Sequence, residues 1–289
     1  MSEAIVVTGV GLVTPLGTGT DSVREAWTRG DSGVRVLGEG DSRLARGIDP
    51  SPLPEIGCAG FVRDFQPRDH VQQGLLRRMD WCSRMLVSAA RLAVRDAGWS
   101  ETDETALART AIVVGSQFGN QRETARYTRR LFEENLGAGS PLLFPNLVLN
   151  APAGYAAIEL GITGPNLTVS EHEASGEAAL AAAHDLLVSG ACDRAVVGGV
   201  DEFGEVYLSA LAERRLLDPR SEARPRRSSR GWIIPGEGAA VVLLEREELA
   251  RRRRARPHAV LEDGEGTRSP WARTPLRTVC RIRQRPLVS

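Results

Sequence analysis

"LTVSEHEASGEAAL", residues 167–180, joins two different sequence patterns at a charged junction. It begins with the apolar run Leu167–Val169, which is typical of a strand, and passes into small residues with helical spacing. Glu171, His172 and Glu173 lie at the junction. A helix of small residues is usually buried, because only small side chains let a helix approach its neighbours closely. The stretch therefore predicts a strand, a charged turn and a buried helix.

Strands and helices alternate on both sides of this stretch. The sequence predicts strands at 4–13, 110–119, 166–170, 194–202 and 238–246, and helices at 20–30, 79–98, 124–137, 145–162, 175–189 and 205–217. The strands are apolar on both faces, which favours a mainly parallel sheet with helices on both sides. We therefore expect an α/β fold.

The composition is that of an ordinary globular protein. Of 289 residues, 42% are apolar and 26% charged, and the formal net charge is +0, so composition favours neither nucleic acid nor a membrane surface as a partner. No stretch approaches the roughly 18–20 apolar residues of a membrane-spanning helix. The N-terminal stretch lacks a basic segment and predicts a strand rather than a signal peptide. The four cysteines form no CxxC pair, which favours reduced thiols in the cytoplasm.

Lysine does not occur, because all 37 basic residues are arginine. Schiff-base chemistry through a lysine amine and a Walker A phosphate loop are both excluded by this. A metal site on Glu171, His172 and Glu173 is disfavoured, because no further histidine or cysteine pair completes the ligand set. The sequence therefore predicts neither a metal nor a cofactor.

Five segments together resemble the β-ketoacyl synthases, the condensing enzymes of fatty acid and polyketide assembly. They are VVTGVGLVTPLG (6–17), GSQFGN (115–120), FPNLVLNAPAGYAAIELGITGPNLTVS (144–170), SGACDRAVVGGVDE (189–202) and PGEGAAVVLLE (235–245). Their order and spacing match the family over about residues 3–262. The resemblance implies a thiolase-like layered α/β/α/β/α fold and a dimer. It implies an interface formed by Asn166, Leu167, Thr168, Val169 and Ser170, and pocket positions at Phe118, Phe203 and Trp232, although Trp232 has packing as an alternative.

Glu173 occupies the position of the family's nucleophile. That nucleophile is a cysteine on the turn between a strand and a buried helix, in a stretch like VSTACASG, with which VSEHEASG aligns. A helix N-terminus activates a thiol, whereas a carboxylate gains the same dipole stabilisation but cannot be usefully acylated. Glu173 is interpreted as a helix cap that pairs across the interface, with a general base or an acceptor for a partner's arginine as alternatives. For His172, packing is favoured over catalysis.

The C-terminal part departs from the family. A full condensing enzyme has a second repeat that supplies a lysine and two histidines, in motifs like HGTGT, and neither histidine motif occurs here. We expect a ketosynthase-like N-terminal domain over 1–250, corresponding mainly to the N-terminal repeat, and a basic, poorly ordered tail over 251–289. Contact of this tail with nucleic acid or a carrier protein is the alternative.

The resemblance is closest to the chain-length factors of type II polyketide synthases, which commonly carry glutamine at the nucleophile position. It implies a non-condensing cytoplasmic subunit that pairs with an active ketosynthase, as a homo- or heterodimer, and shapes the acyl tunnel. An acyl carrier protein is the further partner implied, with no membrane and no nucleic acid. Two alternatives stay open: an enzyme that decarboxylates or hydrolyses an acyl thioester through Glu173 and His172, and a truncated chain without function.

Overall fold

The centre of the molecule is a single large β-sheet. The computed structural model describes residues 4–36, 58–100, 103–134, 139–217, 233–262 and 281–284. Within these ranges the sheet has the strand order β10–β9–β1–β8–β7–β5–β6, and β2 pairs with β1. Its strands are β1 (Ile5–Thr14), β2 (Gly17–Thr18), β5 (Thr110–Gly115), β6 (Asn166–Val169), β7 (Arg194–Asp201), β8 (Gly238–Arg246), β9 (Ala259–Glu262) and β10 (Arg281–Gln284). The short strands β3 (Arg35–Val36) and β4 (Cys58–Ala59) form a separate pair.

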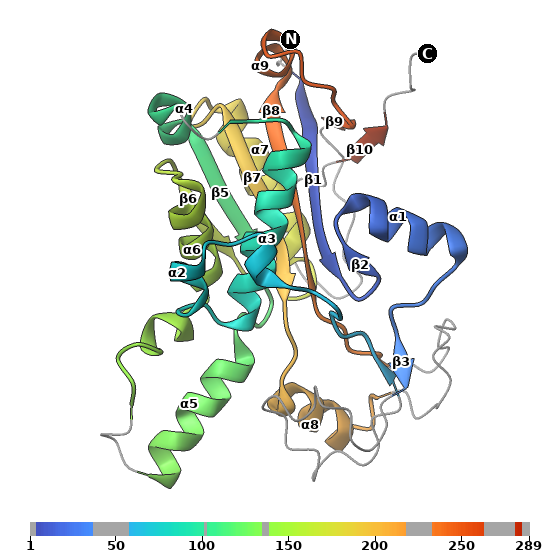
Figure 1. The fold of residues 1–289 in the computed structure, drawn as a ribbon, viewed down its shortest axis with the longest axis vertical. Coiled ribbons are helices and arrows are strands. Elements are labelled where there is room, and N and C mark those ends of the chain that lie inside the picture. The colour runs from blue at the N-terminus through green and yellow to red at the C-terminus, as the bar shows by residue number, and fades with distance from the viewer. Residues whose placement is uncertain are drawn as a thin grey trace.

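Helices cover both faces of this sheet. Three of them belong to the two core clusters that join helices to the sheet. The remaining described helices are α1 (Thr20–Arg29), α2 (Gln73–Leu76), α4 (Glu104–Ala108), α5 (Gln121–Glu133), α8 (Glu205–Glu213) and α9 (Glu247–Arg252), with the short 3-10 helices Pro67–Asp69 and Phe144–Leu147. One core cluster joins α3 (Trp81–Asp96) and α6 (Ala151–Leu160) to the sheet, and a second joins α7 (Ser175–Val188) to its opposite face. Figure 1 shows α3 in front of the strands and α7 behind them.

Alternation along the strands explains this layering. Successive strand residues point to opposite faces, so Val196 packs in the cluster with α3 while its neighbour Val197 packs in the cluster with α7. The six residues of β5 are all buried. The predicted covering of both sheet faces is therefore confirmed.

The prediction of a mainly parallel sheet is wrong. β5 pairs in parallel with β6 and β7. The pairs β7–β8, β8–β1, β1–β9 and β9–β10 are antiparallel. Apolar residues on both faces of a strand indicate only that both faces are covered. Helices on both sides of a sheet cover both faces whatever the strand direction, so the pattern does not distinguish parallel from antiparallel strands.

Part of the predicted basic tail is ordered. α9 continues to Arg252, and β9 pairs with β1 through Val7 and Ala259. Ala259 and Leu261 are buried in the same cluster as α7, so this strand belongs to the core of the sheet. β10 pairs with β9. Residues 263–280 and 285–289 of the tail lie outside the described residues. Of the helices described, none is long and apolar enough to cross a membrane.

Candidate functional site

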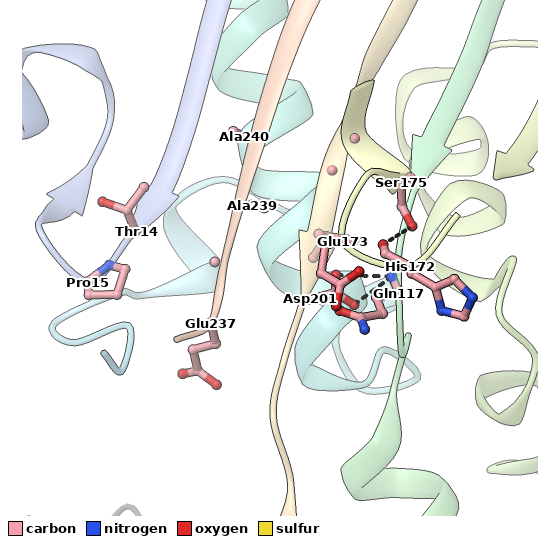
Figure 2. Close-up of a pocket in the computed structure, with 15 residues that line it drawn as sticks. Thr14, Pro15, Gln117, His172, Glu173, Ser175, Asp201, Glu237, Ala239 and Ala240 are labelled. Carbon is pink, nitrogen blue, oxygen red and sulfur yellow. Dashed lines mark hydrogen bonds between the residues drawn. The ribbon is translucent and has the colours of Figure 1, made fainter. Parts of the chain in front are cut away.

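A cleft of about 450 Å³ lies at one end of the sheet (Figure 2). It lies where the parallel strands β5 and β7 end and where β8 begins. Asp201, the last residue of β7, is paired in register with Gly238, the first residue of β8. Carboxyl ends of parallel strands are common places for ligand sites. The lining residues are Thr14, Pro15, Gly115, Gln117, His172, Glu173, Ser175, Gly176, Gly199, Val200, Asp201, Glu237, Gly238, Ala239 and Ala240.

The charged turn before α7 is held together by Ser175. Its hydroxyl donates to the carbonyl oxygen of His172 at 2.6 Å and accepts the amide N–H of Glu171 at 3.0 Å. His172 adopts a left-handed backbone conformation with φ 52°, which is unusual for a residue with a side chain. The turn thus places Glu173 near the positive dipole end of α7, directly before the N-cap residue Ala174. The interpretation of Glu173 as the helix cap is therefore wrong, because the N-cap residue is Ala174 and α7 has no side-chain capping hydrogen bond.

Glycines allow α7 to approach the sheet closely at this point. A Cβ atom on Gly115, the last residue of β5, would lie 2.1 Å from the carbonyl oxygen of Ser175. A Cβ atom on Gly199 would lie 3.6 Å from the Cα atom of Gly176. The position of Glu173 in the cleft therefore depends on glycine in β5.

Asp201 organises the loop that follows β5. Its carboxylate accepts the Ser116 hydroxyl at 2.8 Å and the amide N–H groups of Gln117 and Phe118 at 3.1 and 2.9 Å. The Ser116 hydroxyl oxygen in turn accepts the amide N–H of Gly119. Because it is satisfied by these donors, Asp201 acts as a support of the cleft wall.

Glu237 forms the opposite wall and is tied to α5. Its side chain is 2% exposed, and its Oε2 atom lies 2.5 Å from the Arg122 guanidinium. Its Oε1 atom accepts the Trp81 indole N–H and the Val62 amide N–H, both at 3.2 Å. Burial raises the pKa of Glu237, and the charge of Arg122 and these hydrogen bonds act against that rise.

The exposed charge of the cleft comes from Glu173. Glu171, His172 and Glu173 are all exposed. In Figure 2 the imidazole of His172 points away from Glu173, so the two side chains do not form an acid–base pair in this conformation. Burial raises the pKa of Tyr207, and the nearby charge of Glu173 raises it further. The Tyr207 phenol is therefore close enough to the cleft to interact electrostatically with Glu173.

None of the described cysteines lines the cleft. Cys58, Cys82 and Cys192 are buried. Burial raises the pKa of the Cys82 thiol well above its usual value, and burial raises that of Cys192 to about 11. Such thiols are largely protonated at neutral pH and react slowly. Within the described ranges, no cluster of three or more histidine, cysteine, aspartate or glutamate residues is arranged to hold a metal ion.

Two of the predicted pocket residues, Phe118 and Phe203, do not line this cleft. The Phe118 ring packs at a tilt against the Tyr207 ring with centroids 4.6 Å apart, and Phe203 is buried against Phe61 in a separate core cluster. Trp232 lies outside the described residues. Their role as acyl-pocket residues stays a prediction.

The predicted interface strand is at an edge of the sheet. β6 pairs only with β5 among the described strands, so its other side is open. Asn166, Leu167 and Ser170 are exposed and Thr168 and Val169 are half-buried. The predicted interface residues and Glu173 lie on one continuous stretch, 166–173, and the interface itself stays a prediction.

Comparison with known proteins identifies the family. Residues 2–250 match the family described as "Beta-ketoacyl synthase, N-terminal domain". The chain therefore belongs to the β-ketoacyl synthase family, and the predicted thiolase-like layered α/β fold is confirmed.

Proteins with curated names agree with this assignment. The chain is 28% identical over 263 residues to 3-oxoacyl-[acyl-carrier-protein] synthase 2 of Staphylococcus aureus (strain N315), covering 89% of this chain and 61% of that protein. It is 27% identical over 273 residues to the mitochondrial 3-oxoacyl-[acyl-carrier-protein] synthase of Arabidopsis thaliana, covering 89% of this chain and 59% of that protein. The chain thus spans about three fifths of the length of these relatives.

Solved structures show the same fold. The ishigamide ketosynthase/chain length factor superimposes with a TM-score of 0.77 at 27% identity, over 90% of this chain and 62% of that chain. A type II polyketide ketosynthase bound to its acyl-carrier protein gives a TM-score of 0.76 at 19% identity, over 94% of this chain and 65% of that chain. At that identity the second comparison bears on the fold alone.

Proposed function

We propose that this chain is a non-condensing ketosynthase-like subunit, similar to a chain-length factor, which pairs with an active ketosynthase and shapes its acyl tunnel. The observation that carries the proposal is Glu173 at the N-terminus of α7, in the cleft, at the position that the resemblance assigns to the nucleophilic cysteine. Condensation by this family requires a thiolate that holds the acyl chain. A carboxylate at that position does not form the thioester, so the chain contributes through binding.

The surface around β6 supports pairing with a partner. Large apolar side chains are exposed on β6, on α6, on the stretch 142–148 and on α5: Leu167, Ile158, Val148, Phe144, Leu142 and Phe132. These elements contact one another in turn, and apolar side chains exposed on neighbouring elements favour a protein–protein interface. The open edge of β6 adds unpaired backbone donors and acceptors, which a strand from a partner satisfies. An active ketosynthase fits this surface, and an acyl carrier protein delivers the chain to that partner.

Substitutions at Glu173 test the proposed role. The wild-type chain, purified with a cysteine-bearing ketosynthase from the same genome, should form a stable 1:1 complex in light scattering. Glu173→Gln should leave ketoacyl production by that complex within about twofold of wild type, because the amide preserves the size of the side chain and no capping hydrogen bond of α7 is lost. Glu173→Cys, assayed alone with an acyl-carrier thioester, should make no ketoacyl product.

The enzyme interpretation makes the opposite prediction. If the isolated wild-type chain decarboxylates or hydrolyses an acyl thioester and Glu173→Gln abolishes that turnover, Glu173 is a catalyst. The non-condensing role then fails, whatever the complex does.

Leu167→Arg tests the interface. Leu167 is 40% exposed on the edge strand, so an arginine there leaves the isolated fold intact but places an unpaired charge in an apolar contact. We expect the dissociation constant of the complex to rise by tenfold or more, on the order of a hot-spot loss. Trp27→Arg is the matched control, because Trp27 is 77% exposed on α1, away from β6. Equal affinity for both variants would place the interface elsewhere.

A further inference from the structure

Behind the wall of the cleft is a buried carboxyl group that is only half satisfied. Glu202 follows β7 directly and is 1% exposed. Its Oε1 atom accepts the backbone N–H of Arg122 at 3.0 Å. Its Oε2 atom has no hydrogen-bond partner among the described residues, and lies 4.0 Å from Arg122 Nε. A buried charge in this condition is costly, whereas a protonated carboxyl is tolerated.

Arg122 is already engaged by other groups. Its terminal nitrogen pairs with Glu237 at 2.5 Å, and its Nε atom donates to the carbonyl oxygen of Phe203 at 3.1 Å. One guanidinium therefore lies between two buried carboxyl groups and favours Glu237. Among the described residues, Arg122 is the one cation paired with these two acids.

The groups around Glu202 oppose its ionisation. Burial raises the pKa of Glu202 to about 8, the charges of Asp80 and Glu237 raise it, and the charge and backbone N–H of Arg122 lower it. Asp80, at the start of α3, bonds to Ser83, and the raised pKa of Cys82 leaves this neighbouring thiol neutral. Asp201, at the end of β7, is bonded to the amides of the loop after β5.

We propose that Glu202 carries a proton at neutral pH, and that loss of this proton in mildly alkaline solution draws Arg122 away from Glu237, so that the cluster is a pH-sensitive switch in the cleft wall. The proton passes from the Glu202 carboxyl group to solvent. The guanidinium then bridges two carboxylates instead of one. The ion pair between Arg122 and Glu237 then weakens. Because Glu237 lines the cleft, the cleft becomes more negatively charged.

Infrared spectroscopy of the full chain tests the protonation state directly. The wild-type protein should show a protonated-carboxyl band at pH 6–7 that is lost with a midpoint near pH 8, which is where burial sets the pKa of Glu202. Glu202→Gln should lack this band. Glu237→Gln removes the competing carboxylate, so the midpoint should fall by one pH unit or more, because Arg122 is then free to pair with Glu202.

The indole of Trp81 gives a second readout of the same step. It donates to Glu237 at 3.2 Å, so its fluorescence should change with the same midpoint in wild type and stay constant in Glu202→Gln. Trp81→Phe identifies the contribution of this indole among the other tryptophans.

Stability should follow the same titration. Between pH 4.5, the ordinary pKa of a glutamate, and about pH 8, the folded chain holds a proton on Glu202 that the unfolded chain has lost. The stability of the wild type therefore falls as pH rises through this window. Glu202→Gln lacks this titration, so its Tm minus the wild-type Tm should be larger at pH 9 than at pH 6 by roughly 4 °C.

Two results would overturn the switch. One is a wild-type spectrum without a protonated carboxyl at pH 6–7, or with a band that Glu202→Gln retains. The other is an identical titration midpoint in wild type and Glu237→Gln, which remains decisive if Glu202→Gln does not fold.

Discussion

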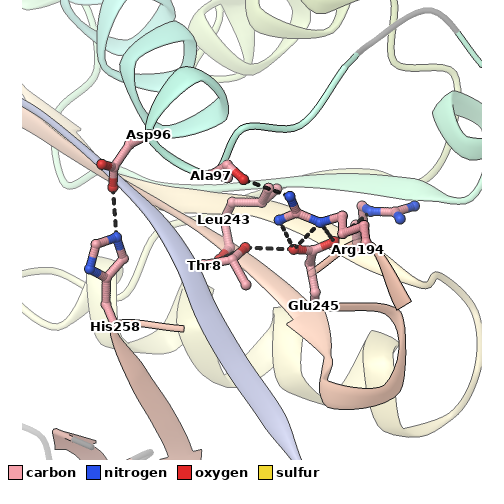
Figure 3. A network of polar contacts seen from close by, with 8 residues as sticks. Thr8, Asp96, Ala97, Arg194, Leu243, Glu245 and His258 are labelled. Atoms are coloured by element: carbon pink, nitrogen blue, oxygen red, sulfur yellow. Dashed lines mark hydrogen bonds and ion pairs between the residues drawn. The ribbon is translucent and has the colours of Figure 1, made fainter. Parts of the chain in front are cut away.

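Replacing Glu245 with alanine is expected to lower the free energy of unfolding by about 3–5 kcal/mol, the range for breaking a buried ion pair by removing one partner. Glu245 lies in β8 and is 0% exposed. It accepts the Thr8 hydroxyl at 2.6 Å and Arg194 Nε at 2.7 Å (Figure 3). Arg253 binds both of its oxygens. Alanine would leave two largely buried guanidinium groups without their counter-ion.

Denaturant unfolding with an unchanged m-value is the measurement, because a change in midpoint alone reports stability. Glu134→Ala is the matched control, since Glu134 pairs with Arg130 at 3.3 Å with both side chains well exposed. Such a surface pair should be worth less than about 1 kcal/mol. A loss at Glu245 no larger than the loss at Glu134 would contradict the network in Figure 3.

Acid should remove this stabilisation. Burial acts to raise the pKa of Glu245, but hydrogen bonds from Arg253 and Thr8 and the charge of Arg253 outweigh it and hold the pKa below 4.5. A lowered folded-state pKa contributes stability above the ordinary pKa that is lost as pH falls through the folded value. The difference between wild type and Glu245→Gln should therefore be constant above pH 5 and shrink below about pH 4.

The fold was largely predictable from the sequence, because its signals are local. The small-residue helix after Val169 and the glycine that ends α1 at Gly30 are encoded within a few residues. Strand direction is not local: β8 runs antiparallel to β7 because of the path of the chain between them. The ordering of β9 likewise depends on pairing with β1, about 250 residues earlier, which the basic composition around it conceals.

The candidate site was predictable only where the family resemblance fixed a position. Glu173 was found in this way, and it does lie in the cleft. Arg122, Glu202 and Tyr207 were missed, because their importance comes from contacts with residues distant in the chain. Two adjacent acids at the end of a buried strand, Asp201 and Glu202, were the available signal. Sequence does not tell that Asp201 accepts several hydrogen bonds whereas one oxygen of Glu202 has no partner among the described residues.

Gly115→Ala should disrupt both the fold and the cleft. The added Cβ atom would lie 2.1 Å from the carbonyl oxygen of Ser175 and 2.8 Å from the backbone nitrogen of Gly176. These are backbone atoms of α7, so no side-chain rotation relieves the contact. We expect a loss of about 3 kcal/mol or more, at or above the upper end for overpacking. Because Ser175 holds the turn that carries Glu173, withdrawal of α7 should also weaken association with the proposed ketosynthase partner.

Gly176→Ala separates this effect from the general consequences of replacing glycine. Gly176 is in the first turn of α7, and a Cβ atom there would meet nothing within 4 Å. Alanine leaves the unfolded chain less conformational entropy than glycine does, so less entropy is lost when the helix folds. The free energy of unfolding should therefore stay equal or rise by up to about 1 kcal/mol. The two positions face each other across the contact between β5 and α7, yet only one has backbone in the path of a new methyl group. Similar losses of unfolding free energy for both variants would mean that α7 does not approach β5 as closely as described. The position of Glu173 in the cleft would then also be wrong.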